Sequence, residues 1–201
     1  MVGLEPVSLD DLIQRVRACT ICKSVLPLGP RPIFRVSETA RILIVGQAPG
    51  LRVHQTGIPW NDPSGDRLRQ WMGIDRETFY DVSRIAIIPT GLCYPGRNAR
   101  GGDLPPRTEC AEQWLPLLLK HLQKIDLKIL AGTYAHRLYL GDRVCGSLTE
   151  TVRSWRDYLP HYFVLPHPSF RNLRWLQNNP WFEKEVVPML RCRIQEVLSL
   201  P

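Results

Sequence analysis

The sequence lacks any apolar run approaching the ~20 residues that a membrane-spanning helix needs. It also lacks internal repeats and low-complexity segments, which argues against repeat, collagenous and disordered classes of protein. The first eleven residues carry three acidic side chains and no apolar core of a secretory signal, so we expect a cytoplasmic protein. Its 201 residues predict one domain, residues 1–201, because this length gives one sizeable hydrophobic core.

Acidic residues are the scarcer charged type, with 19 Asp and Glu against 26 Lys and Arg, a formal net charge of +7. A basic excess of this size favours a polyanionic partner such as nucleic acid. Six cysteines occur without an export signal, which favours reduced thiols or metal ligands over disulfides.

Short apolar, β-branched runs alternate with helical patterns along the chain. Four strands buried on both faces, typical of a parallel sheet, are predicted over residues 41–46, 85–88, 127–131 and 162–165. Helices are predicted over residues 12–19, 66–72, 107–123, 134–140 and 180–200. Pro116 is expected to kink the helix over 107–123, because proline removes a hydrogen bond from a helix interior. The fold class is therefore α/β.

Three loops of unusual composition follow the ends of these strands: residues 46–66, 90–106 and 167–179. In parallel sheets, ligands bind in the crevice at the carboxyl ends of the strands. We therefore expect the functional site to be built from these three loops.

Four cysteines have the spacing of metal ligands. Cys19 and Cys22 form a C-x₂-C pair, and sixteen residues separate Cys93 from Cys110. Thiolates are soft ligands that suit an iron–sulfur cluster or zinc. The alternative is that they bind no metal and serve as small buried core residues, as we interpret the other two cysteines.

Five motifs occur in one order: the C-x₂-C pair, GQAPG at residues 46–50, GIPW at 57–60, Cys93-x₁₆-Cys110, and HPS at 167–169. Together they resemble the uracil-DNA glycosylase superfamily from about residue 15 to residue 195. The cysteine pattern is similar to its iron–sulfur branches, families four and five, and residues 57–66 are most similar to family five. The resemblance implies a three-layer α/β/α sandwich around a four-stranded parallel sheet. It also implies a [4Fe–4S] cluster at the four cysteines, with zinc or no metal as alternatives.

The implied activity is hydrolysis of the N-glycosidic bond of uracil in DNA, which leaves an abasic site for base excision repair. The nucleotide would be flipped out of the stack into a pocket. No lysine lies in residues 46–66 or 90–106 to form a Schiff base, so a monofunctional enzyme is expected. We expect a monomer whose partner is DNA containing uracil, with no membrane and no nucleotide cofactor. One alternative is a protein of the same fold that binds deaminated DNA without turnover, and another is a redox protein.

The resemblance gives roles to two aromatic side chains. Trp60 matches the aromatic that stacks on the flipped base, and a flat indole suits any pyrimidine. His167 matches the histidine that hydrogen-bonds uracil O2 as negative charge builds there. The alternatives are a core tryptophan in a proline-rich turn and a surface histidine in a loop.

The glycine motif departs from the family pattern. Related enzymes often carry an acid or asparagine there, but Gln47 and Ala48 cannot accept a proton from water. The resemblance to family five assigns the water to Asp62, with Asp66 as second choice and Gln47 as a further catalytic candidate. Asp62 can alternatively cap a helix. His54, in the same loop, can orient water or contact phosphate.

The residues expected to recognise the base also depart from the family pattern. Families one and four present an asparagine at the end of the second strand, where this sequence has Pro89-Thr90-Gly91. The candidate contacts to the base are therefore Thr90, Gln47 and the backbone of Gly46 and Ala48. We expect the range of substrates to extend to other deaminated bases.

Basic and polar residues around the loops are candidate contacts to DNA. Arg171 holds the position at which the family places a wedge that fills the gap left by the flipped base. The full set of candidate DNA contacts is Arg171, Asn172, Arg174, Arg97 and Arg100. The alternative for the last three is an ordinary solvated arginine on the surface.

Overall fold

A four-stranded parallel sheet forms the centre of the computed structural model, which describes residues 7–99 and 101–200. Its strands are β1 (Ile42–Val45), β2 (Ile85–Ile87), β3 (Leu127–Ala131) and β4 (Tyr162–Leu165). Their order is β2-β1-β3-β4 and every neighbouring pair is parallel. The predicted parallel sheet is confirmed, with strand ends within a residue of those predicted.

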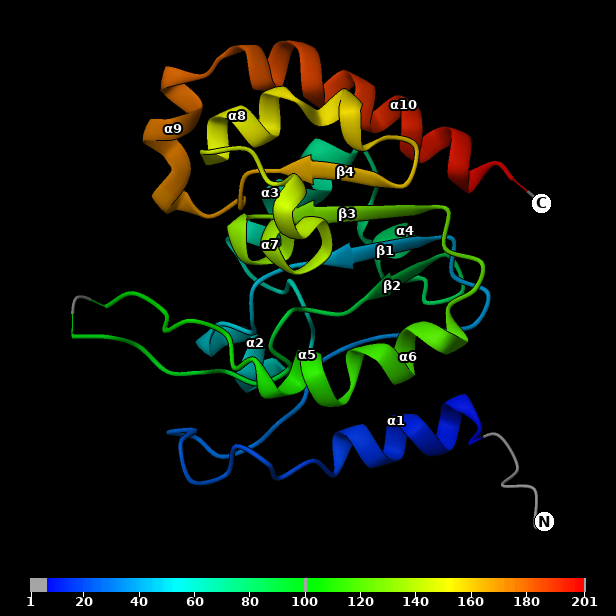
Figure 1. Ribbon diagram of the computed structural model, residues 1–201, viewed down its shortest axis with the longest axis vertical. Coiled ribbons are helices and arrows are strands. Elements are labelled where there is room, and N and C mark those ends of the chain that lie inside the picture. Colours follow the sequence, from blue (N-terminus) through cyan, green and yellow to red (C-terminus); the bar gives the residue numbers. More distant parts are fainter. Residues whose placement is uncertain (1–6, 100, 201) are drawn as a thin grey trace.

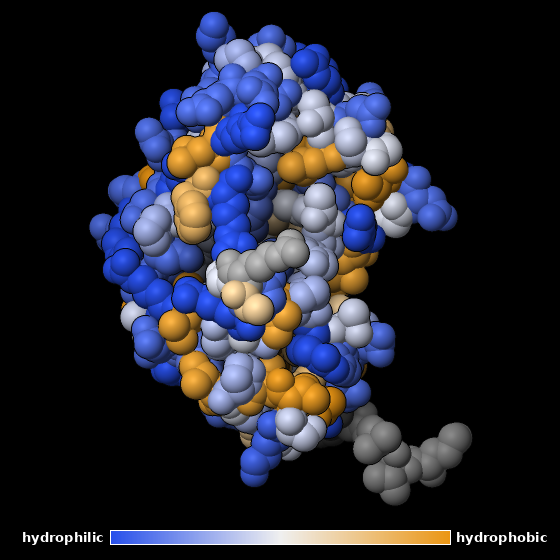
Figure 2. Space-filling model, turned by 90° about the vertical axis from the view of Figure 1, so that its left-hand side faces the viewer, coloured by the Kyte–Doolittle hydropathy of each residue, from blue (hydrophilic) through white to orange (hydrophobic). Residues whose placement is uncertain are grey.

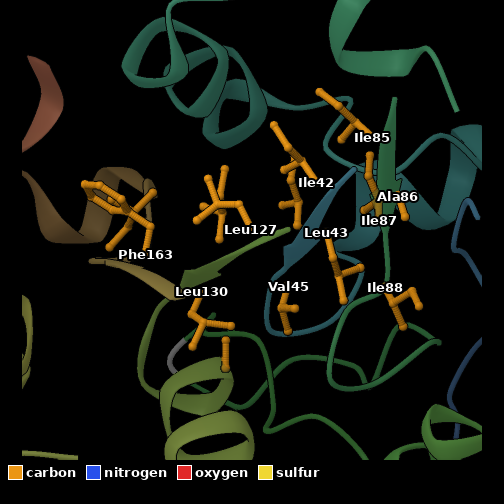
Figure 3. Close-up of a cluster of buried hydrophobic side chains, with 14 of the residues drawn as sticks. Ile42, Leu43, Val45, Ile85, Ala86, Ile87, Ile88, Leu127, Leu130 and Phe163 are labelled. Atoms are coloured by element: carbon orange, nitrogen blue, oxygen red, sulfur yellow. The ribbon is translucent and has the colours of Figure 1, made fainter. Parts of the chain in front are cut away.

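The strands are apolar at almost every position because both faces of the sheet are covered. All four residues of β1 and all three of β2 are buried. Side chains alternate between the faces with the period of two that a strand imposes. Figure 3 shows Ile42 and Leu127 pointing to one side of the sheet and Val45 and Leu130 to the other.

Helices cover both faces, so the sheet is the middle of three layers. In Figure 1, α7 lies in front of the sheet and α3 and α4 lie behind it. In the described residues, the α-helices are α1 (Leu9–Arg17), α2 (Leu51–Thr56), α3 (Pro63–Met72), α4 (Arg76–Tyr80), α5 (Glu109–Gln113), α6 (Leu115–His121), α7 (Thr133–Leu140), α8 (Leu148–Arg153), α9 (Leu173–Asn178) and α10 (Val187–Leu198). Short 3₁₀ turns span Gly141–Arg143, Trp155–Tyr158 and Phe170–Asn172, and a π-helical turn, Phe182–Val186, leads into α10.

The predicted helix over residues 107–123 is two helices rather than one with a kink. The first, α5, ends at Gln113, and α6 begins at Leu115, with Trp114 between them. Pro116 lies in the first turn of α6, where a backbone N–H has no helical partner to lose. The prediction of a kink is therefore wrong, because the proline starts a new helix.

The carboxyl ends of all four strands lie at one edge of the sheet, on the left of Figure 1, where a long loop projects from the body. We call residues 94–99 and 101–106 of this loop the arm. Backbone hydrogen bonds fold the arm back on itself: Asn98 donates to the Gly102 carbonyl at 2.7 Å, and Leu104 donates to Gly96 at 2.9 Å. Arg100, a predicted DNA contact, lies outside the described residues.

The helices within residues 7–99 and 101–200 are all too short or too polar to cross a lipid bilayer.

Candidate active site at the carboxyl edge of the sheet

A cavity of about 680 Å³ opens at this edge. Each strand contributes to its wall through the residues that follow it: Gly46 after β1, Pro89 after β2, Gly132 after β3 and His167 after β4. The arm lines its mouth. Figure 2 looks onto this edge and shows hydrophilic side chains across the middle, with apolar side chains on either side. A volume of this size is typical of a site for a small molecule or a single nucleotide.

His167 presents a neutral imidazole of defined tautomer to the cavity. The backbone N–H of Ser169 donates to its Nδ1 at 3.2 Å, so the ring proton is carried by Nε2. Burial lowers the pKa of His167 to about 4, because desolvation disfavours the charged ring. The side-chain amide of Asn172 donates to the His167 carbonyl at 2.7 Å. The ring is therefore a fixed hydrogen-bond donor at neutral pH.

Trp60 packs beside this histidine in a backbone conformation that L-residues seldom adopt. Its φ is +56°, and its ring centroid lies 5.5 Å from that of His167 with 29° between the planes. A Cβ added at Gly46 would lie 2.6 Å from Cζ2 of the indole, so only glycine admits the ring there. Arg69 donates to the Trp60 carbonyl at 3.3 Å. These contacts hold the indole at the wall of the cavity.

Asp62 both caps a helix and lines the cavity. The Gly65 N–H donates to its Oδ1 at 2.8 Å, the N-cap geometry for α3. Burial raises the pKa of this carboxyl above its usual value, because desolvation disfavours the charged form. The second-choice acid, Asp66, has a side chain that is 75% exposed, pairs with Arg69 and does not line the cavity. The structure therefore places only the first of these two acids at the cavity.

Gln47 and Ala48 line the cavity, whereas Thr90 lies outside the lining and is hydrogen-bonded to their loop. The hydroxyl of Thr90 donates to the Gln47 carbonyl, which also accepts the Gly91 N–H at 2.9 Å. The Gln47 amide donates to the carbonyl of Leu104 in the arm at 3.5 Å. Thr90 is buried and lies outside the cavity lining, so its hydroxyl is not presented to a ligand.

His54 lies behind the wall rather than in it. The ring is buried 5.9 Å from that of Tyr94, and its Nδ1 has no hydrogen-bond partner among the described residues. Burial, reinforced by the charge of Arg31, lowers the pKa of His54. His54 is therefore not part of the cavity lining in this arrangement.

The predicted DNA contacts divide into two groups. Arg97, Arg171 and Asn172 line the mouth of the cavity. Arg171 reaches across to the arm, where its Nη2 donates to the Gly101 carbonyl at 2.7 Å. Arg174 lies on α9, exposed and outside the lining.

Sequence reasoning missed a contact that positions the turn after β4. Arg67, on α3, donates from Nη1 to the carbonyls of Pro168 at 3.2 Å and Ser169 at 3.4 Å. The donor and the first acceptor are 101 positions apart, so no local pattern indicates the contact. Through this contact α3 holds the turn that carries His167.

The four predicted ligand cysteines line a second, smaller cavity, together with Trp114 and four apolar residues. The indole N–H of Trp114 donates to Cys19 Sγ at 3.2 Å. Burial raises the pKa of Cys93 to about 12 and that of Cys110 to about 11. Within the described part of the chain, no three His, Cys, Asp or Glu side chains form a group that can hold a metal ion. The sulfur atoms thus share one cavity without the close grouping that a single ion requires.

Comparison with known families gives one match to report. The model described as "Uracil DNA glycosylase superfamily" matches residues 34–191, more than half of the chain. The matched span contains all four strands, the arm and the cavity-lining residues described above. It begins after Cys19 and Cys22, so it does not extend to the first pair of cysteines.

Proposed function

The chain belongs to the uracil DNA glycosylase superfamily, and from this premise we propose that it hydrolyses the N-glycosidic bond of uracil in DNA. Membership supports a glycosylase-type function that acts on DNA. One observation carries the specific proposal: His167, a neutral donor whose proton is on Nε2, lines the same cavity as Trp60 and Asp62. This combination supplies a donor, a flat apolar wall and a carboxylate.

The substrate is a nucleotide flipped out of the base stack, because the glycosidic carbon is inaccessible inside a duplex. Its base lies against the indole of Trp60, which Gly46 and His167 keep in place. Stacking of a base on an aromatic side chain is worth ~1–3 kcal/mol. This favourable contact offsets part of the cost of unstacking.

The reaction consumes one water molecule. Its oxygen attacks C1′ of the sugar as the bond from C1′ to N1 breaks, and the bonding pair leaves with the uracil ring. The N–H of His167 donates to uracil O2, where the negative charge develops. The water proton passes to the free carboxylate oxygen of Asp62, since Oδ1 is engaged by Gly65. The uracil anion takes up a proton and Asp62 gives one up to solvent, so the products are free uracil and an abasic sugar.

The base is recognised by the glycine loop rather than by a side-chain amide from β2. Pro89 lines the cavity at the end of that strand, and the hydroxyl of Thr90 is engaged by the Gln47 carbonyl. The contacts left for the base edge are the Gln47 side chain and the backbone of Gly46 and Ala48. Backbone groups discriminate among bases less strictly, so other deaminated bases are also substrates.

We also propose that Cys19, Cys22, Cys93 and Cys110, at the second cavity, would be the ligands of a [4Fe–4S] cluster. Support comes from the donor set, four sulfur atoms around one cavity. Thiolates are the ligands that such a cluster takes. With four ligand positions filled by protein, its contribution is to hold three segments of the chain together.

Cleavage of a labelled oligonucleotide with one uracil, followed by alkali, tests the proposal. We expect strand breaks with the wild-type protein and a large loss for His167→Ala at unchanged affinity, because the donor acts on charge that exists only near the transition state. Hypoxanthine, xanthine and thymine-mismatch duplexes measure the range of bases. Binding of uracil DNA without cleavage would instead support a binding protein of the same fold.

A further inference from the structure

The arm carries one acidic side chain, that of Asp103, and this side chain lines the cavity. Among the described residues, only Asp62 and Asp103 bring a carboxyl group to the cavity lining. Asp62 is already engaged, because Gly65 donates to one of its oxygens and the proposed reaction uses the other for the water. An exposed acidic side chain is ordinary on a protein surface. Asp103 differs because it lies at a cavity that is proposed to take a base.

Two contacts define where the Asp103 carboxylate lies. Its Oδ1 pairs with Nε of Arg97 at 3.5 Å, and the backbones of the same two residues form an antiparallel bridge. Its Oδ2 lies 3.8 Å from where a Cβ on Gly50 would be, so this oxygen is beside the glycine loop, residues 46–50. In Figure 1 the arm returns to the body beside α2, the helix that Gly50 caps. One oxygen is therefore paired within the arm, and the other lies at the loop that lines the cavity.

The backbone on both sides of this carboxylate is held by hydrogen bonds. The Gly102 N–H donates to Oδ1 of Asn98 at 2.9 Å. The Leu104 N–H donates to the Gly96 carbonyl at 2.9 Å, and the Leu104 carbonyl accepts from the Gln47 side chain at 3.5 Å. The last contact joins the arm to the glycine loop. A group that is fixed before its ligand arrives loses less conformational entropy on binding.

The polar groups near the end of β2 do not distinguish one base edge from another. Pro89 lines the cavity there, and the hydroxyl of Thr90 is bonded to the Gln47 carbonyl. The side-chain amide of Gln47 has both a donor and an acceptor, so it can match either kind of edge. A carboxylate has acceptor oxygens only. Asp103, the carboxylate that the proposed reaction leaves unused, can therefore distinguish a ring N–H from a ring nitrogen with a lone pair.

Deamination of cytosine reverses the hydrogen-bonding character of one ring atom. N3 of cytosine has a lone pair and accepts, whereas N3 of uracil carries a hydrogen and donates. A carboxylate oxygen accepts from the uracil N3–H and repels the lone pair of cytosine. Thymine has the same N3–H as uracil and differs from it only by a methyl group at C5. An acceptor at this place therefore separates uracil from cytosine but does not separate uracil from thymine.

We propose that Asp103 accepts a hydrogen bond from N3–H of the flipped base and thereby excludes cytosine from the cavity. The inference rests on the proposed function, and it adds a side chain of the arm to the contacts that the glycine loop makes with the base edge. Arg97 completes the arrangement, because its charge offsets that of a carboxylate close to the phosphates of DNA. Binding sites gain specificity by repelling the wrong ligand as well as by attracting the right one.

Affinity for duplexes that contain one 2′-fluoro nucleotide tests the inference without cleavage, because the fluorine disfavours positive charge at C1′. The nucleotide carries uracil, cytosine or thymine in an otherwise identical sequence. We expect the wild type to prefer uracil over cytosine, and Asp103→Ala to reduce this preference about ten- to a hundredfold, the range of one hydrogen bond to a charged group. The preference between uracil and thymine stays unchanged, because both bases carry the N3–H.

Asp103→Asn separates attraction from repulsion. The amide keeps an oxygen that accepts from uracil, and its N–H₂ group can turn toward N3 of cytosine. We expect its affinity for cytosine to rise, whereas Asp103→Ala loses affinity for uracil. Asp142→Asn is the matched control, because Asp142 is exposed and outside the cavity lining, and its affinities should equal those of the wild type. Thermal unfolding of each variant accompanies the assays, and substitution of an exposed side chain should leave the folded state intact.

Several results would overturn the inference. An equal loss of affinity for all three bases in Asp103→Ala would assign the carboxylate to the water or to the DNA backbone. A changed preference between uracil and thymine would make it a barrier to the methyl group. Unchanged preferences in both variants, or a wild type with no preference for uracil over cytosine, would remove Asp103 from the base edge. A wild type that prefers uracil through Asp103 but cleaves nothing would refute the proposed activity and leave this inference standing.

Discussion

The carboxylate of Asp62 caps α3 and also lines the cavity. These two roles have opposite effects on the stability of the folded state. The cap on Gly65 stabilises α3. Burial raises the pKa of the same group, so its ionised form destabilises the folded state. Because the folded pKa lies above the unfolded one, this group favours folding at low pH, and that contribution is lost as the pH rises through the folded pKa.

Asp62→Asn separates the two tasks. Asparagine caps a helix as well as aspartate does and carries no charge to desolvate. We expect single-turnover cleavage to fall by about 10²–10⁴-fold, with a melting temperature at pH 7 equal to or above that of the wild type. Asp66→Asn is the matched control, because that carboxylate is exposed and outside the cavity. Wild-type cleavage by Asp62→Asn would remove the assignment of the water to this residue.

The two histidines whose pKa values are lowered most predict how stability depends on pH. Burial lowers the pKa values of His136 and His167 to about 4 from the usual 6.5. Between these values the unfolded chain binds protons that the folded chain does not, so stability falls as the pH falls from about 6.5 to about 4. Each ring contributes up to ~3 kcal/mol to this loss. Urea unfolding at pH 7 and pH 5 measures it, and His167→Gln should reduce the slope; an unchanged slope would contradict the assignment.

The site residues that could be predicted from the sequence are those that lie in recognisable local motifs. Trp60, Asp62 and His167 follow recognisable turns, and all three line one cavity. The hydrogen bonds that Arg67 and Arg171 donate could not be predicted from the sequence. Their partners are carbonyls of segments distant in sequence, and a backbone carbonyl carries no residue-specific signal.

Among the elements, α3 organises the site. Its N-cap is Asp62, Arg69 on its inner side binds the Trp60 carbonyl, and Arg67 binds the turn that carries His167. The three candidate functional side chains are therefore positioned by one helix. A disturbance of its first turn should affect all of them together.

Gly65→Ala tests this organisation. A Cβ at this position would lie 1.7 Å from the Trp60 carbonyl oxygen, a distance that no side-chain movement relieves because the obstacle is backbone. We expect a loss of at least ~1–3 kcal/mol in the free energy of unfolding, together with loss of cleavage. Gln70→Ala, at an exposed position of the same helix outside the cavity lining, is the control and should behave like the wild type.

Arg67 gives a milder test of the same helix. Arg67→Ala removes the donor to the Pro168 carbonyl and leaves the Ser169 carbonyl with the Asn172 N–H, so the turn with His167 is less well fixed. We expect about a tenfold lower cleavage rate, the effect of roughly 1.4 kcal/mol on a barrier, at unchanged affinity for DNA. Arg67→Lys retains a donor and should recover part of the rate. A fall in affinity equal to the fall in rate would show that the residue binds DNA instead.

Strands were easier to predict than helices in this chain for a physical reason. A strand buried on both faces must be apolar throughout, as β1 and β2 are, and such runs are conspicuous. The helices α2, α4, α8 and α9 have five or six residues, which is too few to show a period of 3.6. Tertiary contacts rather than sequence pattern define them.

On the scale of the whole molecule, the cysteine cavity joins three segments. Cys19 and Cys22 follow α1, while Cys93 and Cys110 stand immediately before and shortly after the arm. A cluster there would tie the N-terminal helix and both ends of the arm into one unit. Sequence spacing predicted a shared site for the four residues, but only the folded chain brings the two pairs to one cavity.

Cys22→Ala tests whether a cluster at the cysteine cavity ties these segments together. We expect purified wild-type protein to contain iron and sulfide, and the variant to lose them and become sensitive to proteases near residues 19–31 and in the arm. Cys192→Ala is the control, because Cys192 is exposed and remote from the cavity lining. Full iron content in Cys22→Ala would remove this cysteine from the ligand set.

The hydrogen bond between Arg171 and Gly101 has a consequence for how a polymer reaches the cavity. It joins the turn after β4 to the arm, and both partners line the cavity. A strand that continues past the flipped nucleotide in both directions has to lie beside this contact or displace it. One hydrogen bond contributes only ~1 kcal/mol net, a population ratio of about five between the bonded and the open arrangement. Displacement of this contact by a bound strand therefore costs little binding free energy.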